Sequence, residues 1–139
     1  MIPLMLLLAR TAGAHVVHDD VGGLAVPDDF ESAGRAWVLL HVDRGERGRT
    51  WDILQTLDGG RSWDPVPPPS LPGDPRSMSA WDGAPVLGLD DGGLLVLDGA
   101  DWRSLEGPGA TPLALDGSGT VLASASTAGL HVRSSTAEA

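Results

Sequence analysis

Two pairs of adjacent carboxylates are the residues of this sequence best suited to acid–base chemistry. They are Asp28 with Asp29 and Asp90 with Asp91, and glycoside hydrolysis needs two carboxyl groups that face each other across a cleft. Aspartates in turn sequences usually bind the local backbone and face water. We therefore interpret the two pairs as turn residues in preference to the catalytic carboxylates of a glycosidase, and we assign no catalytic residue from the sequence.

A second cluster could bind a metal ion. His15 and His18 precede Asp19 and Asp20, and imidazole and carboxylate groups suit copper or zinc. Cleavage of the chain after Ala14 would add a free amine to His15. Two histidines at this spacing are also common in polar segments, so we expect a polar start to the first strand, with no metal and no cofactor.

Arginine and tryptophan side chains are the candidates for ligand binding. Arg44, Arg47 and Arg49 lie in one loop, where they could contact an acidic partner or a sugar carboxylate. The alternative is a solvated hairpin tip, because exposed ion pairs contribute little energy. Trp81 precedes the turn sequence Asp82-Gly83 and is the candidate for an exposed aromatic platform, whereas Trp37 and Trp51 lie in apolar stretches typical of a core.

The composition excludes several classes of function. Nineteen acidic residues against nine basic ones give a net charge of −10, which disfavours nucleic acid and anionic membranes as partners. All nine basic residues are arginine, and the chain has no lysine, tyrosine or cysteine. Lysine Schiff bases, tyrosine nucleophiles and thiolate chemistry are thereby excluded.

The first fourteen residues resemble a secretory signal peptide. An apolar run over residues 2–9 leads to Ala12-Gly13-Ala14, a pattern typical of a cleavage site. No positive charge precedes the run, and Arg10 follows it. We expect a signal peptide over residues 1–14 and export to the periplasm or beyond; the alternative is a cytoplasmic protein with an N-terminal core strand. The run is too short to span a bilayer.

From residue 20 onward, short apolar stretches alternate with turn residues. Nineteen glycines and eleven prolines leave little room for helices, so we predict an all-β chain. The expected strands are 23–26, 36–42, 50–56, 62–66, 77–81, 85–89, 93–97, 101–105, 111–115, 120–124 and 129–134.

These strands fall into groups of four that repeat. TLDGGRSW at 56–63 aligns with VLDGADW at 96–102, which places Trp63 and Trp102 39 residues apart. Four short strands near forty residues is the period of a β-propeller blade. We expect one domain over 15–139 with blades at about 20–67 and 75–107 and an incomplete blade at about 108–139. Closed propellers have about four to eight blades, so this is a partial propeller.

The turn at 56–63 has residue types that fix its geometry. Asp58 can accept hydrogen bonds from N–H groups ahead of it, and Gly60 can adopt a positive φ. Trp63 supplies a large apolar plate that we expect to pack on a neighbouring strand or blade. We therefore expect these residues to be structural rather than catalytic.

The order Thr56-x-Asp58-x-Gly60-x-Ser62-Trp63 resembles the Asp box of the bacterial-neuraminidase repeat family, which includes sialidases, sortilin-type receptors and a photosystem-assembly propeller. The resemblance implies that the turn joins the third and fourth strands of a blade. The second copy keeps Asp98 and Trp102 but has Val96 and Ala100 at the hydroxyl and glycine positions. Sialidases use a tyrosine nucleophile, which this chain lacks, so the resemblance implies a fold and not that activity.

Taken together, the sequence predicts a non-enzymatic binding or scaffold module, exported, that holds a protein or glycan partner. A fragment of a glycoside hydrolase propeller is the alternative, and a relic without a ligand is a third. Neither nucleic acid nor membrane insertion is expected. The small number of blades predicts self-association, or further blades, to complete the ring.

Overall fold

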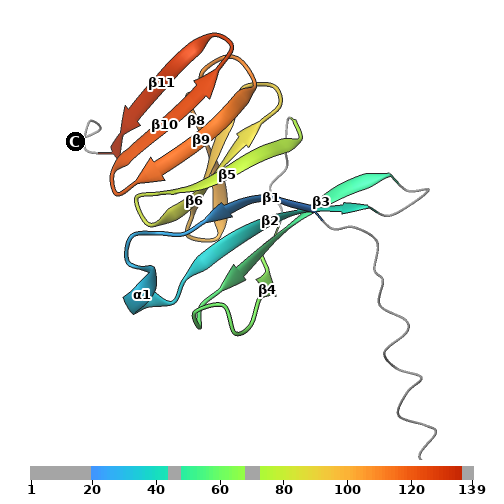
Figure 1. Cartoon of the computed structure of the whole chain (residues 1–139), viewed down its shortest axis with the longest axis vertical. Coiled ribbons are helices and arrows are strands. Elements are labelled where there is room, and N and C mark those ends of the chain that lie inside the picture. The colour runs from blue at the N-terminus through green and yellow to red at the C-terminus, as the bar shows by residue number, and fades with distance from the viewer. Residues whose placement is uncertain (1–19, 44–47, 68–72, 136–139) are drawn as a thin grey trace, which may run out of the picture.

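The computed structural model describes residues 20–43, 48–67 and 73–135, which form three antiparallel sheets (Figure 1). Sheet 1 has the order β1 (Asp20–Ala25), β2 (Ala36–Asp43), β3 (Arg49–Thr56), β4 (Asp64–Pro65), with the helix α1 (Phe30–Ala33) between β1 and β2. Sheet 2 has the order β5 (Pro75–Trp81), β6 (Ala84–Leu89), β7 (Leu94–Asp98), β8 (Asp101–Leu105). Sheet 3 contains β9 (Pro112–Ser118), β10 (Val121–Ser126) and β11 (Gly129–Ser134).

The all-β prediction is confirmed, and each expected strand overlaps an observed one, although several differ from it in their bounds. One element was not expected. The helix α1 is a single turn that ends at Gly34, whose φ of 64° lets its N–H donate to the Phe30 carbonyl at 2.7 Å. Four residues are too few to show helical periodicity in a sequence, which is why the turn sequence gave no signal.

Strand β4 is shorter than the predicted 62–66. Only two of its residues pair with β3, Asp64 with Gln55 and Pro65 with Leu54, and Val66 adds one bond from its N–H to the Ile53 carbonyl at 2.8 Å. Pro65 and Pro67 lack the N–H that a longer ladder would need. Ser62 is also unavailable, because its N–H and hydroxyl both bind Asp58.

The three sheets stack through their first strands. Strand β1 contacts β5, and β5 contacts β9, so that one sheet follows the next in chain order (Figure 1). We name the face of a sheet that looks toward the next sheet its front face and the opposite face its back face.

Two apolar clusters fill the spaces between the sheets. The front face of sheet 1 packs on the back face of sheet 2 through Ala25, Trp37, Leu39, Ile53, Met78, Ala80, Leu87, Leu89 and Leu95. The front face of sheet 2 packs on the back face of sheet 3 through Trp81, Val86, Leu94, Val96, Leu105 and Leu122. Sheet 2 is therefore buried on both faces, and burial of apolar surface between sheets is what makes each sheet stable.

Within the described part of the chain, no helix is long and apolar enough to cross a membrane.

Candidate ligand-binding cavity

A cavity of about 400 Å³ lies where loops of all three sheets meet. Sheet 1 contributes the segment 27–29 after β1 and Arg35 before β2; sheet 2 contributes residues 80–83 at the β5–β6 hairpin; sheet 3 contributes Gly117, Gly119 and Thr120 at the β9–β10 hairpin. Each contribution comes from the end of the first strand of its sheet. The stacking of the first strands is thus what assembles the cavity.

The β5–β6 hairpin has the sequence of a tight turn. Trp81 pairs with Ala84, and the two central residues both have positive φ, 51° at Asp82 and 73° at Gly83. An Asp-Gly pair with two positive φ values gives the turn whose twist matches the flanking strands. The Asp82 N–H donates to the Gly119 carbonyl at 2.7 Å, which fixes this turn against sheet 3.

Trp81 is not the exposed platform that its place before a turn suggested. Its side chain is 5% exposed, and its indole N–H donates to the Thr120 carbonyl at 2.7 Å. The expectation of an exposed ring was wrong because sheet 3 covers it, a contact between residues 39 apart in the sequence. Trp81 lines the cavity as a wall.

Gly117 allows β9 to approach β5 closely. A Cβ atom at this position would overlap the carbonyl oxygen of Ala80, so no other residue fits without a backbone shift. The close approach positions the β9–β10 hairpin at the cavity.

Of the described residues that line the cavity, Arg35 is the one with a cationic side chain. Its guanidinium carbon lies 5.3 Å from the centre of the Trp37 ring, within the range of a cation–π contact. Its Nε is buried and donates no hydrogen bond. A buried donor without an acceptor costs about 1–3 kcal/mol, so the position of this side chain is not explained by its own hydrogen bonds.

Three exposed carboxylates, Asp28, Asp29 and Asp82, also line the cavity. With Arg35 they give the wall an acidic excess of two charges, counted as three carboxylates minus one guanidinium. The cavity therefore offers carboxylate acceptors for a cation and one guanidinium side chain for a carbonyl or carboxylate.

The predicted carboxylate pairs do not face each other. Asp28 and Asp29 lie with Asp82 at the cavity, whereas Asp90 and Asp91 follow β6, which runs away from the Asp82 turn. The six residues of β6 separate the Asp82 turn from Asp90 by about 20 Å. The structure thus does not bring the four carboxylates into one cleft.

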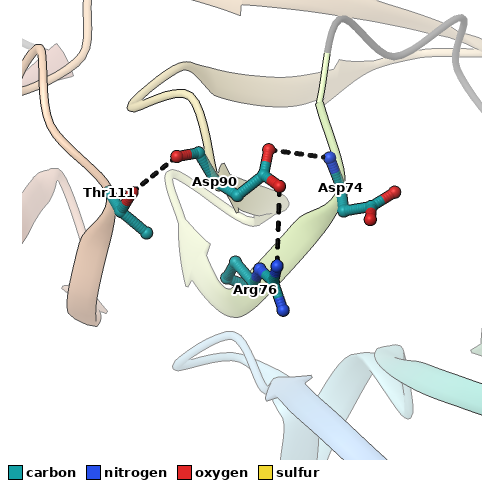
Figure 2. Close-up of polar contacts among 4 residues, drawn as sticks. All are labelled: Asp74, Arg76, Asp90 and Thr111. Carbon is teal, nitrogen blue, oxygen red and sulfur yellow. Dashed lines mark hydrogen bonds and ion pairs between the residues drawn. The ribbon is translucent and has the colours of Figure 1, made fainter.

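Asp90 instead connects three segments of chain (Figure 2). Its carboxylate accepts from the Asp74 N–H at 3.0 Å and lies 3.5 Å from the Arg76 guanidinium. Its carbonyl accepts from the Thr111 hydroxyl at 2.5 Å. Asp90 therefore holds the start of β5 and the start of sheet 3 against the β6–β7 turn.

We expect the free energy of unfolding of an Asp90→Ala variant to be about 1 kcal/mol lower than that of the wild type, because the Asp74 N–H loses its acceptor. Loss of the exposed ion pair with Arg76 adds little. Urea denaturation measures this loss. Asp101→Asn, at an exposed position in the β7–β8 hairpin, is the control and should change nothing. A loss equal to that of the control would contradict the role of Asp90.

The β3–β4 turn is organised around Thr56 and Asp58. The Thr56 hydroxyl donates to Asp58 Oδ1 and accepts from the Gly60 N–H, both at 2.9 Å. Asp58 Oδ1 also accepts from the Arg61 and Ser62 N–H groups at 2.9 Å, and Oδ2 accepts from the Ser62 hydroxyl at 2.7 Å. Gly60 has a φ of 88°. The carboxylate is thus engaged by the turn itself.

These bonds lower the pKa of Asp58 from 3.8 to about 2, first through the Ser62 N–H, then through the Ser62 and Thr56 hydroxyls. The ionised carboxylate therefore stabilises the fold fully above the unfolded pKa of 3.8, and this contribution is lost as the pH falls through about 2.

We expect Asp58→Asn to be less stable than the wild type at about pH 5 and the gap to close toward about pH 2. Thermal unfolding of both proteins across this range measures the gap. Because the other carboxylates titrate in both proteins, their effect cancels. A gap that stays constant would contradict the charge-dependent role of Asp58.

The corresponding turn in sheet 2 is simpler. Asp98 pairs with Asp101 across a two-residue turn, and its carboxylate lies 3.5 Å from Arg103 Nε. Trp102 packs on the cluster between sheets 1 and 2, and its indole N–H donates to the Pro67 carbonyl at 3.2 Å. The tryptophan of this turn thus joins its sheet to the one before it.

Trp63 has no such neighbour. It is 38% exposed and belongs to neither buried cluster, which corrects the expectation that it packs on an adjacent blade. The reason follows from Trp102: the equivalent contact would need a sheet behind sheet 1, and none of the described residues supplies one.

Most of the other residues predicted to bind a ligand or a metal lie outside the described part of the chain. Arg49 lies opposite Asp43 at the end of the β2–β3 ladder. Arg44, Arg47, His15, His18 and the predicted signal peptide lie outside the described residues. Among the residues that the structure does describe, no group of three histidine or acidic side chains could hold a metal ion.

Comparison with known proteins gives structural neighbours only. No protein-family model and no curated protein matches the chain. A solved structure of YCF48 bound to D1 peptide aligns with 78% of this chain at a TM-score of 0.52 and 21% identity. YCF48 from Cyanidioschyzon merolae aligns with 83% at a TM-score of 0.55 and 18% identity.

The chain has the fold of a partial β-propeller. It spans about a third of the length of these neighbours, 33% and 34%. The fold-class prediction is confirmed by these neighbours together with the three stacked sheets.

Sequence reasoning missed Arg35 and the cavity as a whole. A signal was present, since residues 27–29, 82–83 and 117–120 each end the first strand of a repeat. Comparing equivalent turns across the repeats, rather than searching for dense clusters, would have placed them together.

Proposed function

We propose that this chain is a non-enzymatic binding module that holds an extended protein segment in the cavity at the ends of β1, β5 and β9. The observation that carries the proposal is the cavity of about 400 Å³, whose wall combines the side chain of Arg35 with the exposed carboxylates of Asp28, Asp29 and Asp82. A peptide carbonyl or carboxylate can accept from the guanidinium of Arg35. The volume is within the usual range of ligand sites.

The charges of the cavity indicate which segment fits. Asp28, Asp29 and Asp82 line the same cavity as Arg35, so a lysine or arginine of the partner gains carboxylate acceptors that a neutral segment leaves unused. We infer a segment with at least one basic side chain. Its binding weakens as salt is raised.

One comparison supports a peptide rather than a glycan. One structural neighbour, of similar fold at 21% identity, is bound to a peptide. Within the cavity, Trp81 is buried, so it offers no open ring on which a sugar could stack. A glycan ligand is therefore the second outcome to test.

Screening a random peptide library displayed on phage tests the proposal. We expect the selected peptides to be rich in lysine or arginine and to bind Arg35→Ala about tenfold or more weakly than the wild type. Arg103→Ala, which removes an exposed arginine outside the cavity, is the matched control and should bind like the wild type.

Three results would contradict the proposal. They are selection of no peptide, equal binding by Arg35→Ala, and binding only to a glycan array. Turnover of aryl glycosides by the purified protein would instead support the glycoside hydrolase fragment.

We also propose that the β3–β4 turn is an Asp box and that the chain belongs with proteins carrying that repeat. The hydrogen bonds of Thr56 and Asp58 and the positive φ of Gly60 support this. Export remains a proposal based on residues 1–14. N-terminal mass analysis of the protein made in its own host tests export, since export predicts a chain beginning after Ala14 and a cytoplasmic protein keeps Met1.

A further inference from the structure

Among the described residues, the two end faces of the three-sheet stack carry exposed apolar side chains. On the back face of sheet 1, Val21 is 67% and Leu24 52% exposed. On the front face of sheet 3, Leu130 is 72% and Val132 57% exposed. None of the other described residues packs over either group, and exposed apolar patches of this kind mark interaction surfaces.

The strand registers place each apolar group on one face of its sheet. Each face also carries one exposed aspartate, Asp52 opposite Leu40 in sheet 1 and Asp116 opposite Ala123 in sheet 3. In sheet 1, Val21 lies opposite Leu40, and Leu24 lies opposite Val38, which in turn lies opposite Leu54. Leu40, Val38 and Leu54 are half-buried. The back face of sheet 1 therefore presents five apolar side chains to its surroundings.

The front face of sheet 3 is built in the same way. Val132 lies opposite Ala123, and Leu130 lies opposite Ala125. Val121, which begins β10 on the same face, is 45% exposed. The back face of sheet 3, in contrast, carries the buried Leu122 and Ser124 toward sheet 2. Apolar residues on both faces are what a sheet needs when another sheet follows it.

The internal repeat determines which surfaces fit each other. Twice within the chain, the front face of one sheet packs on the back face of the next. The front face of sheet 3 and the back face of sheet 1 are also one front face and one back face, but they lack a described partner within the chain. A second copy of the chain has a back face for the first and a front face for the second.

The exposure of Trp63 indicates independently that no other described sheet packs behind sheet 1. Its counterpart Trp102 packs on the preceding sheet, whereas Trp63 is 38% exposed. A sheet placed on the back face of sheet 1 would cover the Trp63 ring.

We propose that two copies of this chain associate head to tail, with the front face of sheet 3 in each copy packed on the back face of sheet 1 in the other. Both contacts form at once, so the dimer is a closed ring with two-fold symmetry and no open face. Two copies supply six sheets, within the range of about four to eight that closed propellers have.

The test uses the full chain and two variants, each with one altered face. Leu130→Asp with Val132→Asp alters the front face of sheet 3; Val21→Asp with Leu24→Asp alters the back face of sheet 1. All four side chains are more than half exposed, so the monomer fold should survive. Leu57→Asp, an exposed leucine in the β3–β4 turn, is the control.

Sedimentation velocity should show a dimer for the wild type and for Leu57→Asp. Each face variant alone should associate about tenfold or more weakly. An equal mixture of the two variants should regain a dimer, because one unaltered front face then meets one unaltered back face. Salt should strengthen the association, since each copy carries a net charge of −10.

Each contrary result overturns the proposal. A monomeric wild type excludes the second copy, and a dimer that persists in either face variant excludes head-to-tail packing. An open series of larger species excludes the closed ring. If the melting temperature of an aspartate variant falls, alanine at the same four positions repeats the test without adding charge.

Discussion

A Gly117→Val variant is expected to lose about 3 kcal/mol of unfolding free energy, the largest loss of the substitutions described. A Cβ atom at Gly117 overlaps the Ala80 carbonyl oxygen, so β9 must move away from β5. The movement separates sheet 3 from sheet 2, and it breaks the bond from the Trp81 indole to the Thr120 carbonyl. Urea denaturation followed by tryptophan fluorescence measures both effects.

Ser118→Ala is the matched control for this experiment. It changes the neighbouring, exposed residue of the same strand and should change stability by less than about 0.5 kcal/mol. If Gly117→Val were as stable as the control, β9 would not approach β5 as the structure shows.

Thr56→Val is expected to lower the free energy of unfolding by about 2 kcal/mol. Thr56 is only 1% exposed, and valine has the same shape but lacks the hydroxyl. The Gly60 N–H then lacks its acceptor, and Asp58 lacks one of its donors. Thr56→Ser keeps the hydroxyl and removes only a methyl group, so it should lose less than half as much. Equal losses in calorimetric melts would show that Thr56 acts by packing alone.

The positions of the strands could be predicted because the signal for each one is local. Short apolar stretches bounded by glycine and proline predict strands. Strands β8 and β11 have the bounds expected for them, 101–105 and 129–134. The turn residues Asp82 and Gly83 were also evident, since an Asp-Gly pair between strands is a strong hairpin signal.

The burial of Trp81 and the exposure of Trp63 could not be predicted in the same way. Trp81 is buried by Thr120 and its neighbours, and Trp63 is exposed because none of the strands in the described part of the chain lies behind sheet 1. Both outcomes depend on which sheet stacks on which face. A local pattern identifies a tryptophan as large and apolar but does not state whether a partner sheet is present.

The candidate site depended on the same long-range information. Arg35 precedes an ordinary apolar strand, and nothing in its immediate sequence indicates that its Nε is buried without an acceptor. The cavity exists only because β1, β5 and β9 end at the same place. By contrast, the motif at 56–63 was visible in sequence because the hydrogen bonds of its Thr56 and Asp58 side chains join residues at most four apart.

The most direct test of the binding proposal is a nitrogen–proton NMR titration of the full chain with the tightest basic peptide from the phage library. We expect saturable shifts at Arg35 Nε, Gly83, Gly119 and the Trp81 indole N–H, and their loss in Arg35→Ala. Shifts confined to the Thr56–Trp63 turn or to Leu130 and Val132 would contradict the proposal that this cavity is the binding site.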